Sequence, residues 1–170
     1  GGTAVSFTQV RSSGSKIKPT GGKAGGPIPY IKILNDVLNG FDQSGKRKGS
    51  GAVYLEPWHS DISAFLDLRQ PGDERVRAHD VFPALWIPDL FMERVKARST
   101  WSLFNPTDVK DLPALYGDAF SKRYEEYEQQ GIQSSTIQAF DLWKKILQRL
   151  SEEGVYWPVF KDRFNERYSL

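Results

Sequence analysis

Two residue patterns alternate along most of this chain. Short runs rich in β-branched and aromatic residues are typical of strands, and longer runs with apolar residues at every third or fourth position are typical of amphipathic helices. Their alternation over 170 residues predicts an α/β fold, because parallel strands need crossover connections that are usually helical. We expect strands at residues 1–7, 52–57, 84–87, 100–104 and 155–160, and helices at residues 29–39, 60–70, 88–97, 117–130 and 136–151.

The expected helices carry local signals for their ends and their buried faces. Pro29 stands in the first turn of the first helix, where a missing amide costs little, and Gly40 follows near its end. Ser60 and Asp61 are expected to cap the second helix through their side-chain oxygens. In the last helix, one apolar stripe is predicted to be core packing: Ile137, Phe140, Trp143, Ile146, Leu147 and Leu150.

Composition narrows the function classes. The chain is 39% hydrophobic and 26% charged, with a net charge of +2, which predicts a folded domain with no overall field for nucleic acid. No apolar run approaches the roughly 20 residues that a membrane span needs, so we expect a cytoplasmic protein. The absence of cysteine excludes disulfides, thiolate metal sites and cysteine chemistry within this chain.

Catalytic candidates are weak. His59 and His79 stand near carboxylates, but neither has the spacing of a metal-ligand motif, so we expect both to be structural or surface histidines. No nucleophile elbow, phosphate-binding loop of the P-loop type or paired carboxylates can be recognised. The sequence therefore predicts no catalytic residue and no directly bound metal in this chain.

Two glycine-rich, cationic loops flank the first helix. The first, residues 12–29, follows Arg11 and contains Lys16, Lys18 and Lys23 among glycines whose amides can approach an anion, an environment suited to a triphosphate. A solvated loop with scattered lysines is an equal alternative on composition alone. The second loop, residues 42–51, adds Gln43, which could read a base edge, to three consecutive cations. Together the loops could sense one ligand.

Several long motifs then identify a resemblance. Residues 54–59 read Tyr-Leu-Glu-Pro-Trp-His, residues 84–92 read Ala-Leu-Trp-Ile-Pro-Asp-Leu-Phe-Met, and residues 124–128 read Tyr-Glu-Glu-Tyr-Glu. In this order, with Asp61-Ile62, residues 65–68, Arg94-Val95 and residues 101–103, they closely resemble the large subunit of class I ribonucleotide reductases. The similarity covers most of the chain and weakens after about Gly131.

The resemblance implies a fold. The family's catalytic domain is a ten-stranded α/β barrel of two five-stranded halves, and this chain resembles a large part of the first half. Residues 1–170 would be a single segment of that barrel domain, in which residues 1–51 carry the two loops and a dimer helix and residues 52–170 carry barrel strands and helices. The helix at residues 29–39 would pack at a homodimer interface.

The resemblance also implies ligands. The family binds an allosteric deoxynucleoside triphosphate or ATP, with or without Mg²⁺, on a loop matched here by residues 11–26. Arg11 would contact effector phosphate and Ile17 would lie near the effector base. The effector-binding residues implied in this way are Arg11, Lys16, Ile17 and Lys18. The second loop would carry the effector's identity to the substrate base, with Gln43 and Arg47 facing the substrate; its residues are Asp42, Gln43, Ser44, Gly45, Lys46, Arg47, Lys48 and Gly49.

Departures from the family limit what the chain could do alone. The second loop is one residue shorter than the commonest version, and Lys48 replaces a frequent proline. The radical cysteine, the redox cysteine pair and the catalytic Asn and Glu would lie before Gly1 or after Leu170. Reduction of a ribonucleotide would therefore need the remaining segments of the large subunit and a radical-generating small subunit, in the cytoplasm of a cell or a virus-infected cell.

Three interpretations remain open at this point. The chain could be a segment of a working reductase, from a split gene, an intein-interrupted gene or a cut chain. It could instead be a non-catalytic homologue that retains nucleotide binding or dimerisation as a regulatory module. The third interpretation is a structural fragment without a ligand site. We favour the first, because an open half-barrel exposes strand edges and apolar faces that natural proteins cover.

Overall fold

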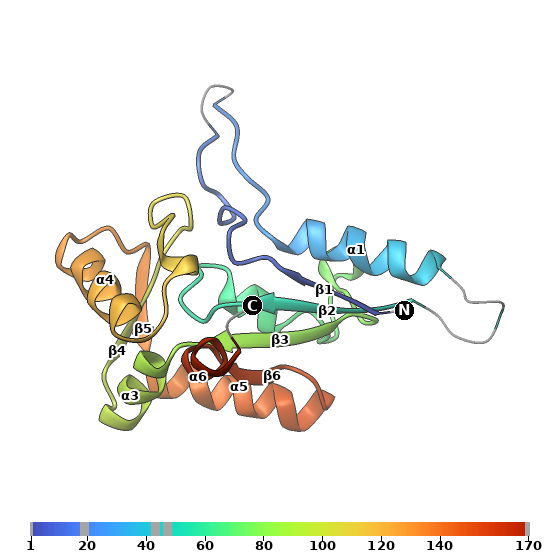
Figure 1. The fold of residues 1–170 in the computed structure, drawn as a ribbon. Coiled ribbons are helices and arrows are strands. Elements are labelled where there is room, and N and C mark those ends of the chain that lie inside the picture. The colour runs from blue at the N-terminus through green and yellow to red at the C-terminus, as the bar shows by residue number, and fades with distance from the viewer. Residues whose placement is uncertain (1, 18–20, 42–44, 46–48, 169–170) are drawn as a thin grey trace.

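A computed structural model describes residues 2–17, 21–41, 45 and 49–168. A parallel sheet in the order β1-β2-β3-β6 forms its centre, and a separate antiparallel pair joins β4 to β5, with helices on both sides of the main sheet (Figure 1). The predicted α/β class is confirmed. The elements are β1 Gly2–Ser6, α1 Ile28–Gly40, β2 Ser50–Leu55, α2 Ile62–Leu66, η1 Glu74–Val76, β3 Phe82–Ile87, α3 Asp89–Ala97, β4 Thr100–Leu103, η2 Leu112–Ala114, α4 Gly117–Gln129, β5 Ser135–Gln138, α5 Ala139–Glu153, β6 Trp157–Phe160 and α6 Lys161–Arg167.

The main sheet has one covered face and one open face. On the covered face, Val53, Leu55 and Leu85 are fully buried, and α1 lies so close that a Cβ on Gly51 would come within 2.4 Å of Leu38. The strand register puts Tyr54 and Trp86 on the opposite, open face. There Phe164 of α6 packs edge-on against Trp86 with ring centroids 5.0 Å apart. Helices α1 and α6 therefore lie on opposite sides of the sheet.

Among the described residues, neither edge strand of the main sheet pairs with a further strand. Strand β1 pairs only with β2 and strand β6 only with β3, and every residue of β1 is exposed. A cavity of about 330 Å³ lies on the open face between the main sheet and α6, lined by Ser6, Tyr54, Trp86, Val159 and Phe164. An open parallel sheet with one face that α6 covers only in part agrees with the expectation of an incomplete barrel.

Most predicted elements are confirmed with small shifts, but several predictions are wrong. The helix predicted at residues 60–70 extends only over Ile62–Leu66, because tighter turns follow it, with the amide of Leu68 donating to the carbonyl of Phe65 at 3.2 Å. Residues 135–138 form strand β5 rather than the start of a helix, because Ile137 pairs with Trp101 of β4, and this pairing outweighs the local helical periodicity. Helix α5 therefore begins at Ala139, with Leu142 buried and Leu147 42% exposed, so the predicted stripe is only partly core. Helix α6 was not expected at all.

The predicted caps of the second helix are also wrong. Helix α2 begins at Ile62 and has no side-chain cap bond. The hydroxyl of Ser60 lies 2.6 Å from that of Ser134, and the carboxylate of Asp61 accepts the backbone amide of Ser13 instead. Both side chains therefore bind residues that are distant in the sequence instead of capping α2.

Candidate functional site

The first glycine-rich loop, which we call loop 1 (residues 7–27), folds back on itself as two paired legs. The amide of Gly14 donates to the carbonyl of Ala24 at 2.9 Å and the amide of Ile17 to that of Gly22 at 2.8 Å. An antiparallel bridge joins Lys16 to Lys23. Gly21 has φ +70°, which favours glycine where the chain turns back. Loop 1 therefore projects from the sheet just before α1 (Figure 1).

A cavity of about 700 Å³ lies at the base of loop 1. Its walls combine two cations, Arg11 and Lys23, with the rings of Phe7 and Tyr30 and with Ile17; the rest of the lining is Val10, Ala24, Gly25 and Gly26. Guanidinium and ammonium groups can bind phosphate oxygens, and aromatic or apolar side chains can contact a flat base. The volume suits a small organic ligand. This arrangement is chemically suited to an anionic ligand that also carries an apolar ring.

The predicted effector residues divide between the cavity and its surroundings. Arg11 and Ile17 line the cavity. Lys16 is exposed and does not line it, whereas its bridge partner Lys23 does; Lys18 lies outside the described residues. Phe7 and Tyr30 are lining residues that we did not predict as site residues, because an aromatic ring in a strand or helix gives no sequence signal of whether it faces a cavity or the core.

The second loop begins at the other end of α1. Gly45 and Gly49 are described, and the amide of Gly49 donates to the carbonyl of Phe41 at 2.8 Å. The other predicted members lie outside the described residues: Asp42, Gln43, Ser44, Lys46, Arg47 and Lys48. Because α1 has 13 residues, its ends are about 20 Å apart at 1.5 Å per residue. Within one chain, α1 thus separates the cavity of loop 1 from the start of the second loop.

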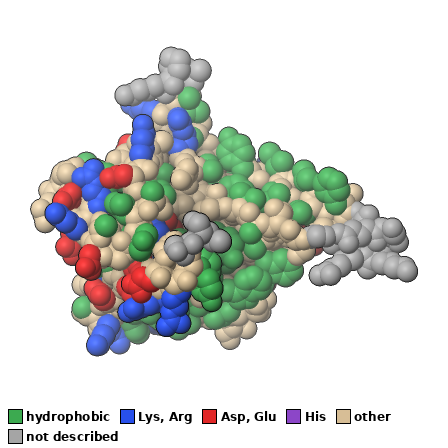
Figure 2. Space-filling view, in the orientation of Figure 1, with side chains coloured by type: hydrophobic (Ala, Val, Ile, Leu, Met, Phe, Trp, Pro, Cys, Tyr) green, Lys and Arg blue, Asp and Glu red, His purple; other side chains and the backbone are tan. Residues whose placement is uncertain are grey.

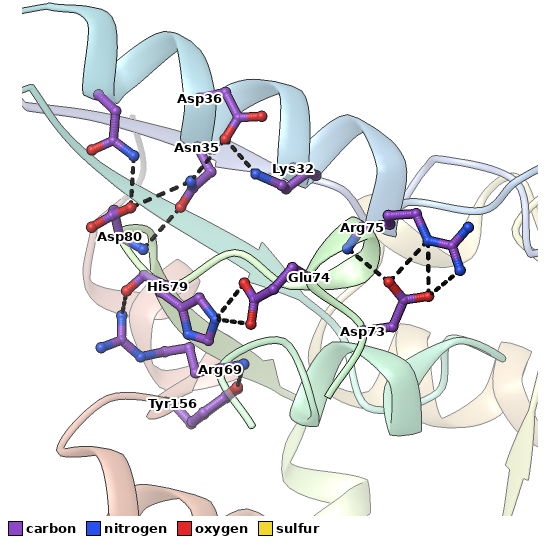
Figure 3. Close-up of polar contacts among 11 residues, drawn as sticks. Lys32, Asn35, Asp36, Arg69, Asp73, Glu74, Arg75, His79, Asp80 and Tyr156 are labelled. Carbon is purple, nitrogen blue, oxygen red and sulfur yellow. Dashed lines mark hydrogen bonds and ion pairs between the residues drawn. The ribbon is translucent and has the colours of Figure 1, made fainter. Parts of the chain in front are cut away.

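Polar contacts fix the rotation of α1 on the protein (Figure 3). The side-chain carbonyl of buried Asn35 accepts the amide of Asp80 at 2.9 Å, and Asn39 donates to the carboxylate of Asp80 at 2.6 Å. Buried Ile31 and Leu38 lie on the same inward side. The outward side, which we call the outer stripe of α1, consists of four exposed residues: Tyr30 at 57%, Ile33 at 59%, Val37 at 48% and Phe41 at 65% exposure.

A buried ion pair lies at the carboxyl end of β2. The Lys161 ammonium is 3.0 Å from both carboxylate oxygens of Glu56, and the indole of Trp58 donates to the same carboxylate at 2.7 Å. Burial raises the pKa of Glu56 from 4.5 to about 7, against the opposing effect of Lys161. Both side chains are only 2% exposed. The pair is enclosed, so it acts within the fold rather than on a ligand.

The two histidines have structural surroundings, as predicted. His59 is fully buried and hydrogen bonded to the carbonyl of Val10 and the amide of Asp61. His79 lies at the surface 3.2 Å from Glu74. Among residues 2–17, 21–41, 45 and 49–168, no three or more histidine, aspartate or glutamate side chains are arranged to hold a metal ion. In the same residues, no helix is both long and apolar enough to cross a membrane.

Comparison with known proteins gives one consistent match. The family model described as the barrel domain of ribonucleotide reductase matches residues 1–170. The chain is 52% identical over 167 residues to the alpha subunit of ribonucleoside-diphosphate reductase from Helicobacter pylori J99, which covers 97% of this chain and 21% of that protein. The alpha subunit from Chlamydia trachomatis serovar D is 47% identical over 174 residues, covering 98% of this chain and 16% of that protein.

A eukaryotic relative shows a similar match. Large chain 2 of ribonucleoside-diphosphate reductase from Saccharomyces cerevisiae is 44% identical over 169 residues, covering 98% of this chain and 19% of that protein. The chain therefore spans about a fifth of the length of the relatives that it matches. Similarity extends past Gly131, where the motifs weaken, to nearly the whole chain.

Proposed function

We propose, because this chain belongs to the ribonucleotide reductase barrel-domain family, that it supplies nucleotide-sensing elements to a ribonucleotide reductase. The chain corresponds to part of the large subunit, and its open parallel sheet to part of the barrel domain. In the proposal, loop 1 binds an allosteric deoxynucleoside triphosphate or ATP, with or without Mg²⁺. The assembled enzyme then reduces ribonucleoside diphosphates to deoxyribonucleotides for DNA synthesis.

The cavity at the base of loop 1 is the observation that carries this proposal. Arg11 and Lys23 supply positive charge for phosphates, and Phe7, Ile17 and Tyr30 supply apolar surface for a base or sugar. Lys16 and Lys18 add charge along the same loop by sequence. Since cations and rings line one cavity, a nucleotide fits its chemistry better than either a simple anion or an apolar molecule does.

The second loop has the role of reading the substrate in this proposal. Gln43 and Arg47 would face the substrate base, and residues 42–49 as a whole would respond to the bound effector. These roles rest on the resemblance to the family, because most of the loop lies outside the described residues. Gly49 lies directly before β2, and its amide donates to the carbonyl of Phe41, which follows α1.

A homodimer through α1 would bring the two loops together. The outer stripe of α1 leaves four large apolar side chains exposed, and a two-fold interface places the same patch on both partners. If the two α1 helices pack antiparallel, loop 1 of one copy lies beside the second loop of its partner. The two loops, which the 13-residue helix α1 separates within one chain, would then contact each other between the two chains.

In this proposal, residues of other polypeptide segments carry out the reduction of the ribonucleotide. The chain has no cysteine, so the radical cysteine, the redox cysteines and the radical itself must be supplied by the rest of the large subunit and by a small subunit. The remaining segments of the barrel domain would cover the open face and both edge strands of the sheet. The assembled protein would act in the cytoplasm, where nucleoside diphosphates are found.

A direct test is titration of the chain with fluorescent dATP. The wild-type chain is expected to bind, and Arg11→Ala to weaken binding about ten- to a hundredfold, because it removes a charge-assisted hydrogen bond. Arg167→Ala, which removes an exposed arginine of α6, is the matched control and is expected to leave binding unchanged. Equal affinity of all three proteins would contradict the assignment of the cavity.

Co-purification tests the wider function. The chain is purified from an extract of the cells that produce it, or it is co-expressed with separately cloned large-subunit segments. Either route is expected to yield a complex that reduces a ribonucleoside diphosphate. Nucleotide binding without any such complex would instead favour a non-catalytic regulatory module. Arg47→Ala in the reconstituted complex is expected to change the choice of substrate rather than effector affinity.

A further inference from the structure

Loop 1 starts from a segment, residues 7–13, that we call the loop root. Three side chains from elsewhere in the chain bind its backbone. The imidazole of His59 is 2.8 Å from the carbonyl of Val10, the carboxylate of Asp61 accepts the amide of Ser13 at 2.9 Å, and the side-chain carbonyl of Asn105 accepts the amide of Ser12 at 3.0 Å. We call these three side chains the root clamp.

The hydrogen bonds of His59 determine which of its ring nitrogens carries the proton. Its Nδ1 atom accepts the backbone amide of Asp61 at 3.0 Å, so Nε2 must carry the hydrogen that it donates to Val10. The ring is fully buried, and burial lowers the pKa of the imidazole. His59 is therefore held as one neutral tautomer that can donate to the loop root.

Asn105 is fixed in the same manner. Its amide nitrogen donates to Thr107 and to Asp108, so its carbonyl oxygen is directed at Ser12. The bridge between His59 and Phe104 brings the segment after β2 beside the end of β4, with backbone bonds from Phe104 to Trp58 at 2.8 Å and from Ser60 to Phe104 at 3.0 Å. The three members of the clamp thus belong to one hydrogen-bonded junction.

Both legs of loop 1 meet at this junction. A Cβ on Gly26, in the returning leg, would lie 3.0 Å from Ser13 and 3.1 Å from the carboxylate of Asp61, and Gly26 has φ +76°. Gly26 also lines the cavity, as does Arg11, which lies between the clamped residues Val10 and Ser12. None of His59, Asp61 and Asn105 lines the cavity. The clamp therefore holds residues of the cavity wall without lining the cavity itself.

We propose that His59, Asp61 and Asn105 are positioning residues that hold Arg11 and the returning leg in the arrangement that a nucleotide phosphate requires. This inference rests on the proposed function of the cavity. It also gives a reason why Asp61 does not cap α2: its carboxylate serves the loop root.

Hydrogen exchange tests the clamp without any nucleotide. In Asp61→Ala and Asn105→Ala, the amides of Gly14, Ile17 and Ala24 are expected to exchange at least about tenfold faster than in the wild type, the effect of losing one charged or well-formed hydrogen bond. The amides of β2 and the thermal midpoint should change little. Unchanged exchange in loop 1 for both variants would overturn the clamp, whatever the cavity binds.

Nucleotide titration tests the consequence. Asp61→Ala and Asn105→Ala are expected to bind fluorescent dATP about tenfold more weakly, whereas Asp61→Asn, which keeps an acceptor oxygen for Ser13, should remain within about twofold of the wild type. Wild-type affinity in both alanine variants would overturn the positioning role. If the wild-type chain binds neither dATP nor inorganic triphosphate, the proposed function fails, and the exchange measurement still decides whether the clamp exists.

Discussion

Two regions of this protein use their aromatic and apolar side chains in opposite ways. In the aromatic module, residues 89–153, the rings pack on one another: Trp101 stacks on Tyr124 at 4.4 Å and Phe91 meets Trp101 at 5.0 Å, all three fully buried. In the N-terminal region, residues 2–41, the outer stripe of α1 faces solvent. Figure 2 shows charged side chains over the α3 and α4 side and hydrophobic ones along α1 and the sheet.

Polar groups differ between the two regions as well. In the aromatic module, Arg94 forms a paired contact with Glu128 at 2.6 and 2.7 Å, and Ser102 donates to the same carboxylate. These bonds connect parts of the module to each other. In the N-terminal region, the loop root depends on His59, Asp61 and Asn105 from outside it. The aromatic module is therefore held together by its own contacts, whereas the N-terminal region exposes the surfaces that we propose for a ligand and a partner.

The largest expected effect is in the aromatic module. Trp101→Ala removes a fully buried ring and its hydrogen bond to the carbonyl of Pro57, so the free energy of unfolding should fall by about 3–5 kcal/mol. Trp157→Ala, at a ring that is 42% exposed on β6, is the control and should cost less than about 2 kcal/mol. Urea unfolding measures both. Equal losses would contradict the distinction between packed and open surfaces.

The buried ion pair of Glu56 and Lys161 lies outside both regions and should give the next largest effect. Lys161→Met leaves the carboxylate of Glu56 buried without its cation, which is expected to cost about 3 kcal/mol at pH 8. Lys145→Met, in a part-exposed pair with Asp67, should cost less than about 1 kcal/mol. If urea unfolding gave both variants the same stability, the enclosed position of the pair would have no energetic consequence.

The pH dependence of stability should separate Glu56 from His59. The pKa of Glu56 is raised from 4.5 to about 7 by burial, so the folded state holds that proton more tightly and stability falls as pH rises through this window. The pKa of His59 is lowered from 6.5 by burial, so its contribution changes in the opposite direction and stability falls as pH drops below 6.5.

Urea unfolding of the wild type and of Glu56→Gln from pH 4.5 to 8 checks these signs. The variant should lose the decline between pH 4.5 and 7 and keep the loss on the acid side that comes from His59. Parallel curves for the two proteins would show that Glu56 does not titrate in this window.

The smallest change in stability is expected on the outer stripe. Ile33→Asp alters a side chain that is 59% exposed, so the free energy of unfolding should change by no more than about 0.5 kcal/mol. Self-association, measured by sedimentation, should nevertheless be lost, because a charge would enter the centre of the proposed two-fold interface. Val76→Asp, at another exposed apolar residue, is the control. A variant that still dimerises would contradict the proposed use of the stripe.

The sequence by itself determined the α/β class, most of the element positions and the family. Strand and helix periodicities are local properties, so residues 28–40, 89–97 and 117–129 could be predicted as helices to within one or two residues. Arg11 and Ile17 could be proposed from the loop's resemblance to the family. The family match over residues 1–170 confirmed the resemblance.

Only the tertiary structure decided which groups meet. Residues 135–138 became a strand because β4 lies beside them, and the carboxylate of Asp61 accepts the amide of Ser13 in the loop root instead of capping α2. Phe7, Lys23 and Tyr30 line one cavity, although 23 positions separate the first from the last. Such contacts depend on where distant backbone segments cross, and no local periodicity carries that information.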